Sequence, residues 1–129
     1  MPTITGSCLC GSVTFEVTGP LRDVIACHCT KCRKTSGHFV AATSCDDDDL
    51  KFVKLDTLAW YRSSPVAERG FCNRCGSTLF FRPDVGNFTG IMAGTLDGQT
   101  GLKLTRHMHC ATKGDYYEIT DGLEQSPEG

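Results

Sequence analysis

Nine cysteines in 129 residues constrain this chain more than any other feature of its sequence. Most of them fall into three short groups, whereas Cys45 and Cys110 stand alone. The chain begins without a basic and apolar leader, so we expect a reducing cytoplasm, where clustered cysteines are metal ligands or redox groups rather than disulfides. The three groups are Cys8-Leu9-Cys10-Gly11, Cys27-His28-Cys29-Thr30-Lys31-Cys32 and Cys72-Asn73-Arg74-Cys75-Gly76.

The first and third groups predict a closed structural zinc site. A Cys-x-x-Cys followed by glycine, as at Cys72 and Cys75, is a tight turn that aims two sulfurs at one ion. Zinc in such a site takes four ligands in a tetrahedron, and Cys8 with Cys10 is the other isolated pair in the chain. We therefore expect these four cysteines to hold one zinc. Binding at sites of this kind stabilises small zinc domains by about 10 kcal/mol.

The central group predicts a second zinc with a vacant position. Cys27, Cys29 and Cys32 lie on one short turn and supply three ligands, which is the pattern of a reactive zinc. Alternatively, His28 or one of the two isolated cysteines completes the tetrahedron. A redox dithiol is a further alternative, but it opens a helix after a strand in a βαβ setting, whereas the flanking pattern here consists of strands and turns.

The ligand set of this second site favours chemistry on sulfur. Zinc with three thiolates has a net negative formal charge and is a weak Lewis acid, so it is poorly suited to ionising water. A thiol that coordinates such an ion is deprotonated outright, whereas a free thiol with a pKa near about 8.5 is mostly protonated at neutral pH. The site therefore suits attack by a small thiol on an electrophilic carbon, or the reverse elimination.

The rest of the chain predicts one mostly-β domain over residues 1–129, ordered from about residue 3 to residue 121. Short apolar–polar alternations that end at glycine or proline are typical of strands. One short helix is expected at 30–36, ending at Gly37. The polar tail after Asp121 is expected to fray. The expected strands are 3–7, 12–18, 24–26, 39–43, 50–53, 57–61, 78–82, 88–93 and 106–110.

Charge and hydropathy argue against two classes of partner. The formal net charge is −2, without the basic excess that nucleic-acid-binding proteins show. We interpret the acidic run at 46–49 as a solvated loop. No apolar stretch has the length of a membrane span. We therefore expect neither nucleic acid nor a membrane as a partner.

Three motifs together resemble the glutathione-dependent formaldehyde-activating enzyme family, which includes relatives of centromere protein V. The resemblance runs from about Thr3 to about Asp121. It implies a β-tent fold of short antiparallel strands around zinc. It also implies a structural zinc and a reactive zinc on the same two sets of cysteines that ligand counting indicates. The motifs are Gly6-Ser7-Cys8-Leu9-Cys10-Gly11-Ser12-Val13, Cys27-His28-Cys29-x-x-Cys32-Arg33-Lys34 and Phe71-Cys72-x-x-Cys75-Gly76-Ser77.

The resemblance implies a carbon–sulfur lyase that joins formaldehyde to glutathione as S-hydroxymethylglutathione. His107, Lys113 and the aromatic pair at 116–117 are similar to a His…Lys…aromatic stretch of the family, whereas His109 and Cys110 depart from it. The alternative function is a zinc-stabilised binding module, or a glutathione carrier without turnover. A vacant metal position favours the enzyme, because a scaffold has no use for one.

Glutathione has two carboxylates, so its pocket needs basic side chains near the open zinc. Arg33 and Lys34 directly follow the last cysteine of the central group, and Lys113 belongs to the stretch that resembles the family. These three are the expected substrate-binding residues, and a solvated surface charge is the alternative for each. Arg62 and Arg69 are expected to lie on the surface.

Overall fold

The computed structural model describes residues 2–129, and it is mostly β, as the sequence predicts. The single α-helix of the described residues is α1 (Thr30–Ser36), and three 3-10 turns are η1 (Asp47–Asp49), η2 (Ala93–Thr95) and η3 (Cys110–Thr112). The strands are β1 (Thr3–Ser7), β2 (Val13–Thr18), β3 (Val24–Cys27), β4 (Val40–Asp46), β5 (Leu50–Leu55), β6 (Leu58–Ser64), β7 (Ala67–Cys72), β8 (Thr78–Pro83), β9 (Phe88–Met92), β10 (Leu104–Met108) and β11 (Glu124–Gln125).

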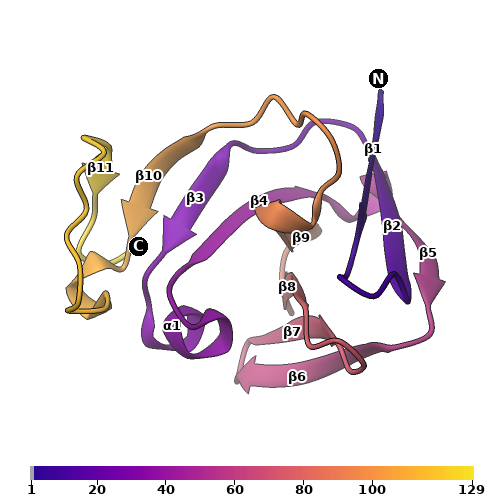
Figure 1. The fold of residues 1–129 in the computed structure, drawn as a ribbon, viewed down its shortest axis with the longest axis horizontal. Helices are drawn as coiled ribbons and strands as arrows, with labels where there is room; N and C mark the ends of the chain where they lie inside the picture. Colours follow the sequence, from indigo (N-terminus) through magenta and orange to yellow (C-terminus); the bar gives the residue numbers. More distant parts are fainter. Residues whose placement is uncertain (1) are drawn as a thin grey trace.

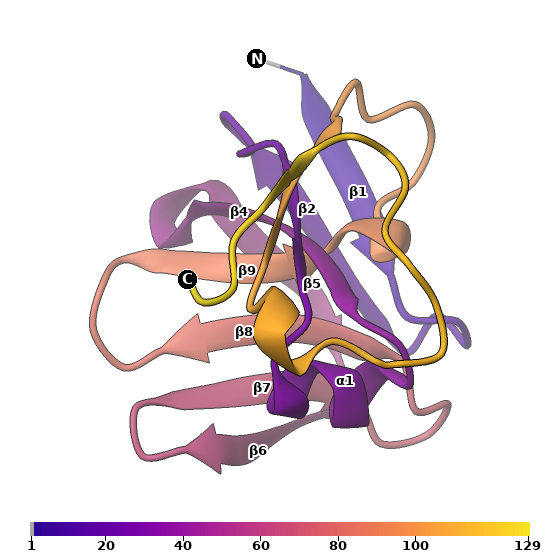
Figure 2. The same cartoon turned by 90° about the vertical axis from the view of Figure 1, so that its left-hand side faces the viewer.

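These strands form two sheets. The smaller has the order β1-β2-β5, and the larger has the order β11-β10-β3-β4-β9-β8-β7-β6. All pairings are antiparallel except those of β10, which runs parallel to both β3 and β11. Figure 1 shows the larger sheet curving from β10 and β3 round to β7 and β6, with α1 at the open end of the curve. In Figure 2 strands β9, β8, β7 and β6 follow one another as a meander.

The main core lies where the smaller sheet packs on the meander. The alternation along β2 buries Val13, Phe15 and Val17 on one face. Phe15 meets Phe80 of β8 edge to face, with the ring centroids 5.0 Å apart. Burial of such aromatic and branched side chains is the largest apolar contribution to stability. A second, smaller cluster contains Cys27, Cys32, Val40 and Met92.

Two features differ from the sequence-based expectation. Strand β7 was not expected, because Glu68, Arg69 and Gly70 interrupt its apolar alternation; it forms because β6 and β8 pair with it on both sides. The tail expected to fray after Asp121 instead pairs as β11 with β10. Both segments are held by backbone hydrogen bonds, which do not depend on how apolar the side chains are. No helix within residues 2–129 is long and apolar enough to cross a membrane.

Candidate metal centres and the adjoining cavity

Four sulfurs from two distant turns meet in the first candidate metal centre. Cys8 and Cys10 follow β1, Cys72 ends β7 and Cys75 follows it, and their sulfurs all lie within 4.8 Å of one another. The Sγ atom of Cys10 is 3.7 Å from that of Cys8 and 3.8 Å from that of Cys72. Sulfurs bound to one tetrahedral zinc at about 2.3 Å are about 3.8 Å apart. The donor set and its spacing therefore fit zinc.

The two turns that supply these sulfurs have the same backbone design. Gly11 donates its N–H to the carbonyl of Cys8 at 3.2 Å, and Gly76 donates to that of Cys72 at 2.9 Å. Both glycines have positive φ, 80° and 81°, which an L side chain rarely adopts. Two further backbone N–H groups of the second turn donate to Cys72 Sγ at 3.4 Å. These donors stabilise thiolates, the form that a metal binds.

The hydroxyl of Ser77 also supports the first centre. It lies 3.2 Å from the Sγ atom of Cys75. This hydrogen bond, with backbone N–H donors, lowers the pKa of Cys75 to about 5. The Cys75 sulfur is therefore disposed to be a thiolate near neutral pH, as zinc binding requires.

The second candidate centre brings together the central cysteines. The sulfurs of Cys27, Cys29 and Cys32 lie within 4.8 Å of one another, and no other His, Cys, Asp or Glu of residues 2–129 joins that group. Cys27 ends β3, Cys29 is the N-cap of α1, and its sulfur accepts the Cys32 N–H at 3.4 Å. Of the alternative fourth ligands, Cys45 is buried in the main core and Cys110 lies in η3. Three soft donors fit zinc with one position left for a ligand.

His28 stands between two of these cysteines, but its ring is engaged elsewhere. The imidazole is fully buried, with Nδ1 at 2.9 Å from the hydroxyl of Tyr117 and Nε2 at 2.9 Å from Nδ1 of His107. His107 Nε2 in turn lies 2.7 Å from a carboxylate oxygen of Asp121. Burial, with His107 nearby, lowers the pKa of His28 and keeps it neutral. The ring therefore points away from the centre, and His28 is not the fourth ligand that the sequence left as an alternative.

Arg69 of β7 is a buried cation that contacts the second centre. The side chain is only 6% exposed, although the sequence predicts a surface position for Arg69. Its Nη2 lies 3.5 Å from Cys32 Sγ, its Nε donates to Ser63 Oγ at 3.2 Å, and its guanidinium lies 5.3 Å from the centroid of the Phe81 ring. The Cys27 thiol, followed by the Arg69 guanidinium, lowers the pKa of Cys32 to about 5. The expectation was wrong because β7 is an interior strand, flanked by β6 and β8.

A cavity of about 450 Å³ opens beside the three sulfurs of the second centre. Strand alternation forms it, because every second residue of β4, β7 and β9 points to the inner face of the curved sheet. Basic side chains at its wall are Arg22, Lys31 and Arg69, and His109 also lines it. The apolar wall consists of Ile25, Val40, Ala42, Val66, Ala67, Phe81, Phe88, Met92 and Met108.

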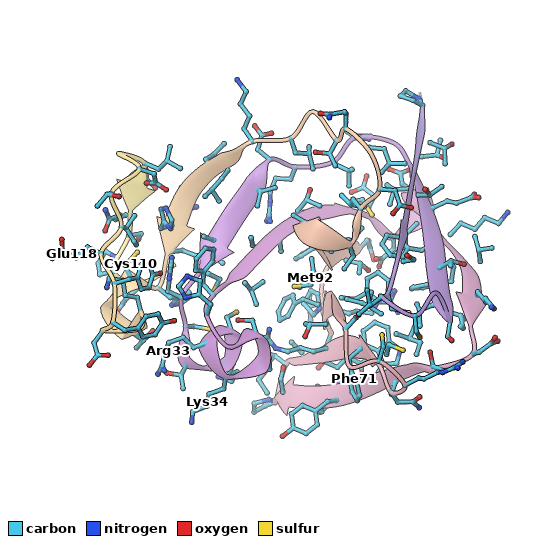
Figure 3. All side chains as sticks on the ribbon, viewed as in Figure 1. Arg33, Lys34, Phe71, Met92, Cys110 and Glu118 are labelled. Carbon is cyan, nitrogen blue, oxygen red and sulfur yellow. The ribbon has the colours of Figure 1, made fainter. Side chains whose placement is uncertain are left out.

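The three expected substrate-binding residues do not line this cavity. Arg33 donates through Nε to the carbonyl of Thr112 at 2.9 Å. Lys34 is exposed, and Lys113 folds back over the ring of Tyr117 with its Nζ 4.7 Å from the ring centroid. Figure 3 shows Arg33 and Lys34 on the outer side of α1. Residues one and two positions after a ligand on a helix point to other faces than the ligand does, which explains their placement.

Comparisons with known proteins show which family this chain resembles. A family model described as glutathione-dependent formaldehyde-activating enzyme matches residues 3–112. A putative glutathione-dependent formaldehyde-activating enzyme of Halomonas elongata is 32% identical over 126 residues, which cover 90% of this chain and 80% of that relative. An uncharacterized lyase of Schizosaccharomyces pombe is 33% identical over 81 residues, which are 63% of this chain and 58% of that relative.

A solved structure is similar as well. The crystal structure of a Rhodobacter sphaeroides protein matches with a TM-score of 0.61 and 28% identity, covering 74% of this chain and 90% of that one. The family match contains both candidate metal centres, because all of their cysteines lie between residues 3 and 112. The chain therefore belongs to the glutathione-dependent formaldehyde-activating enzyme family.

Proposed function

We propose that this protein is a carbon–sulfur lyase that binds a small thiol, glutathione, at the second centre and adds it to formaldehyde or a related aldehyde. In this proposal the protein holds two zinc ions, a structural one on Cys8, Cys10, Cys72 and Cys75 and a reactive one on the central cysteines. The observation that supports it most is the three-sulfur centre at the wall of a cavity, without a fourth protein ligand among the described residues.

The residues around the second centre suit a thiolate. A zinc ion on the three sulfurs would supply a strong preference for the thiolate form of an incoming thiol. Arg69 places a buried positive charge beside Cys32, where negative charge gathers as the thiol loses its proton. An opposite charge at such a distance in a largely desolvated site favours the ionised sulfur. The chain therefore contributes charge balance to the step that activates the thiol.

The addition itself needs no oxidant or reductant. The sulfur lone pair forms a carbon–sulfur bond with the aldehyde carbon, the carbonyl π electrons move to oxygen, and that oxygen takes up the proton that the thiol released. The apolar wall of the cavity holds the two partners together, which favours addition.

Calorimetric titration of the two-zinc protein with reduced glutathione tests the proposal. S-methylglutathione serves as the matched control, because it has the same charges but no ionisable sulfur. We expect binding of the thiol at least tenfold tighter than that of the methylated control, and loss of the difference in Cys29→Ser. Formaldehyde consumption above the uncatalysed rate would then separate an enzyme from a carrier. Equal binding of the two ligands would count against a thiol at this centre.

A further inference from the structure

Away from the cysteine sulfurs, the charge pattern of the cavity is one-sided. Its wall contains the cations of Arg22, Lys31 and Arg69, and no Asp or Glu. Away from the sulfurs, a ligand's ammonium group would therefore lose its water without gaining an anionic partner, whereas a carboxylate would gain a cation. That part of the cavity thus discriminates by the sign of the ligand's charge.

The wall between these cations is mostly apolar. Ile25 of β3 lies opposite Ala42 of β4, and Ala42 lies opposite Met92 of β9, so that their side chains form a continuous strip across paired strands. Gly90 of the same strand also lines the cavity, and a Cβ atom at that position would lie 3.3 Å from Cβ of Phe81. Formaldehyde has no methylene group that could be buried on this strip, so a one-carbon substrate makes no use of it.

The two ends of the cavity differ in chemistry. The three cysteine sulfurs lie at the end of β3, whereas Arg22 precedes the start of that strand. The backbone N–H of Arg22 donates to the carbonyl of Ser44 at 3.1 Å. Five residues of extended chain, from Arg22 to Cys27, span roughly 16 Å. Arg69 belongs to the sulfur end, where the thiolates already engage its charge.

Arg22 is held in place but has no acidic partner. Its Nη2 donates to the carbonyl of Ala42 at 2.8 Å, and its Nε donates to that of Asp23 at 3.2 Å. No ion pair within residues 2–129 includes it. A guanidinium fixed by two carbonyls, with its charge uncompensated at the wall of a cavity, is preorganised for an anion.

We infer that the aldehyde accepted by this protein has an apolar body and a carboxylate remote from the carbonyl, and that Arg22 binds the carboxylate. The assignment of an aldehyde group to that molecule rests on the proposed function. The assignment of its apolar body and its carboxylate rests on the cavity alone. In this assignment Arg22 is a specificity-determining residue, and the strip of Ile25, Ala42 and Met92 holds the apolar body.

Binding of simple probes to the two-zinc protein tests the inference by calorimetry. Hexanoate, 1-hexanol and hexylammonium share a body and differ in charge. We expect hexanoate to bind about tenfold more tightly than 1-hexanol, and hexylammonium not to bind. Affinity should rise about fourfold for each methylene from butanoate to hexanoate, as burial of the chain requires.

Variants locate the carboxylate. Arg22→Gln should reduce hexanoate affinity about tenfold and leave 1-hexanol unchanged, Arg22→Lys should retain most of the affinity, and Lys34→Gln is the matched surface control. Because Arg22 is exposed, we expect all three variants to fold. Equal affinity of wild type and Arg22→Gln for hexanoate would overturn the inference, since the carboxylate would then lie elsewhere, for example on the metal. Equal binding of the three probes would also overturn it.

The outcome is independent of the glutathione titration. If glutathione fails to bind but Arg22→Gln weakens hexanoate, the proposed function falls and the cavity assignment stands. If glutathione binds through its thiol but Arg22→Gln leaves the affinity for hexanoate unchanged, the proposed function stands and the cavity assignment falls. With an active protein, 6-oxohexanoate should exceed hexanal in kcat/KM by about tenfold, and Arg22→Gln should remove that preference.

Discussion

Arg69 illustrates how a single buried charge depends on the group beside it. A guanidinium that is 6% exposed and has no carboxylate partner within residues 2–129 would be costly to bury by itself. The negative charge of the neighbouring sulfurs offsets that cost, and the Phe81 ring stacks on the cation. The second centre therefore accounts for the burial of Arg69, and Arg69 in turn helps to lower the pKa of Cys32.

Replacement of Arg69 should make the second centre lose zinc at a higher pH. A lowered pKa favours the ionised form of Cys32, and protons compete with the metal for that sulfur as the pH falls. Arg69→Gln removes the cation, so the pKa of Cys32 rises and the pH at half occupancy should shift upward by about one unit. Zinc content after equilibration between pH 5 and 8 measures the shift.

The control for this experiment is Arg62→Gln. Arg62 lies near Arg69 in sequence but is exposed and bonded to Asp84 at 2.8 Å. We expect its replacement to leave the pH of zinc release unchanged. An identical shift in both variants would indicate a general charge effect and would contradict a specific role for Arg69.

At the scale of elements, the C-terminal segment is tied to the turn that contains the central cysteines. Tyr117 and Asp121 close the two ends of a hydrogen-bonded chain that passes through His28 and His107. Neutral rings allow one consistent arrangement, in which each donates through Nε2 and accepts at Nδ1. Strand β11 adds backbone hydrogen bonds to β10. The family match ends at residue 112, so this C-terminal strap, residues 113–125, follows the part of the chain that the family model matches.

Removal of one hydroxyl tests the strap. Tyr117→Phe leaves Nδ1 of the fully buried His28 without its donor, which should lower the free energy of unfolding by about 1–3 kcal/mol. Tyr116→Phe is the matched control, because Tyr116 is 62% exposed and contacts the exposed His38. Denaturant unfolding of the zinc-saturated proteins measures both. Equal, small effects would show that the buried chain adds nothing to stability.

For the molecule as a whole, the two centres differ in what they join. The first connects the loop after β1 to the end of β7, so that Cys10 and Cys72 are 62 positions apart in sequence. The second joins residues of one turn that β3 and α1 already hold. A cross-link between distant segments restricts the unfolded chain far more than a local one. Global stability should therefore depend chiefly on the first centre.

A pair of single-sulfur substitutions separates these roles. Cys72→Ser should abolish cooperative folding, because it leaves three thiolates in the centre that joins two distant turns. Cys29→Ser should remain folded and lose the second zinc. Zinc analysis, with a wild-type value of two per chain, and thermal unfolding measure the two effects. Comparable loss of folding in both variants would argue against a division into a structural and a reactive centre.

The sequence by itself determined the grouping of the cysteines and the mostly-β character. Both are local properties, because a Cys-x-x-Cys-Gly turn or a strand alternation is complete within a few residues. The cap of α1 is equally local, since Cys29 and Gly37 bound the helix that the sequence predicts. The structure accordingly brings together the same two sets of cysteines that ligand counting groups.

Only the tertiary structure decided which cations reach the cavity. Arg33 and Lys34 are next to a ligand in sequence but point away from it, because successive residues of a helix face different directions. Arg22 and Arg69 are distant in sequence, and they line one cavity only because the order and register of β3, β4, β9, β8 and β7 place them on one face of a curved sheet. Strand order is a long-range property, set by which segments pair, and a one-residue slip in register would turn the side chains of a strand to the other face of the sheet.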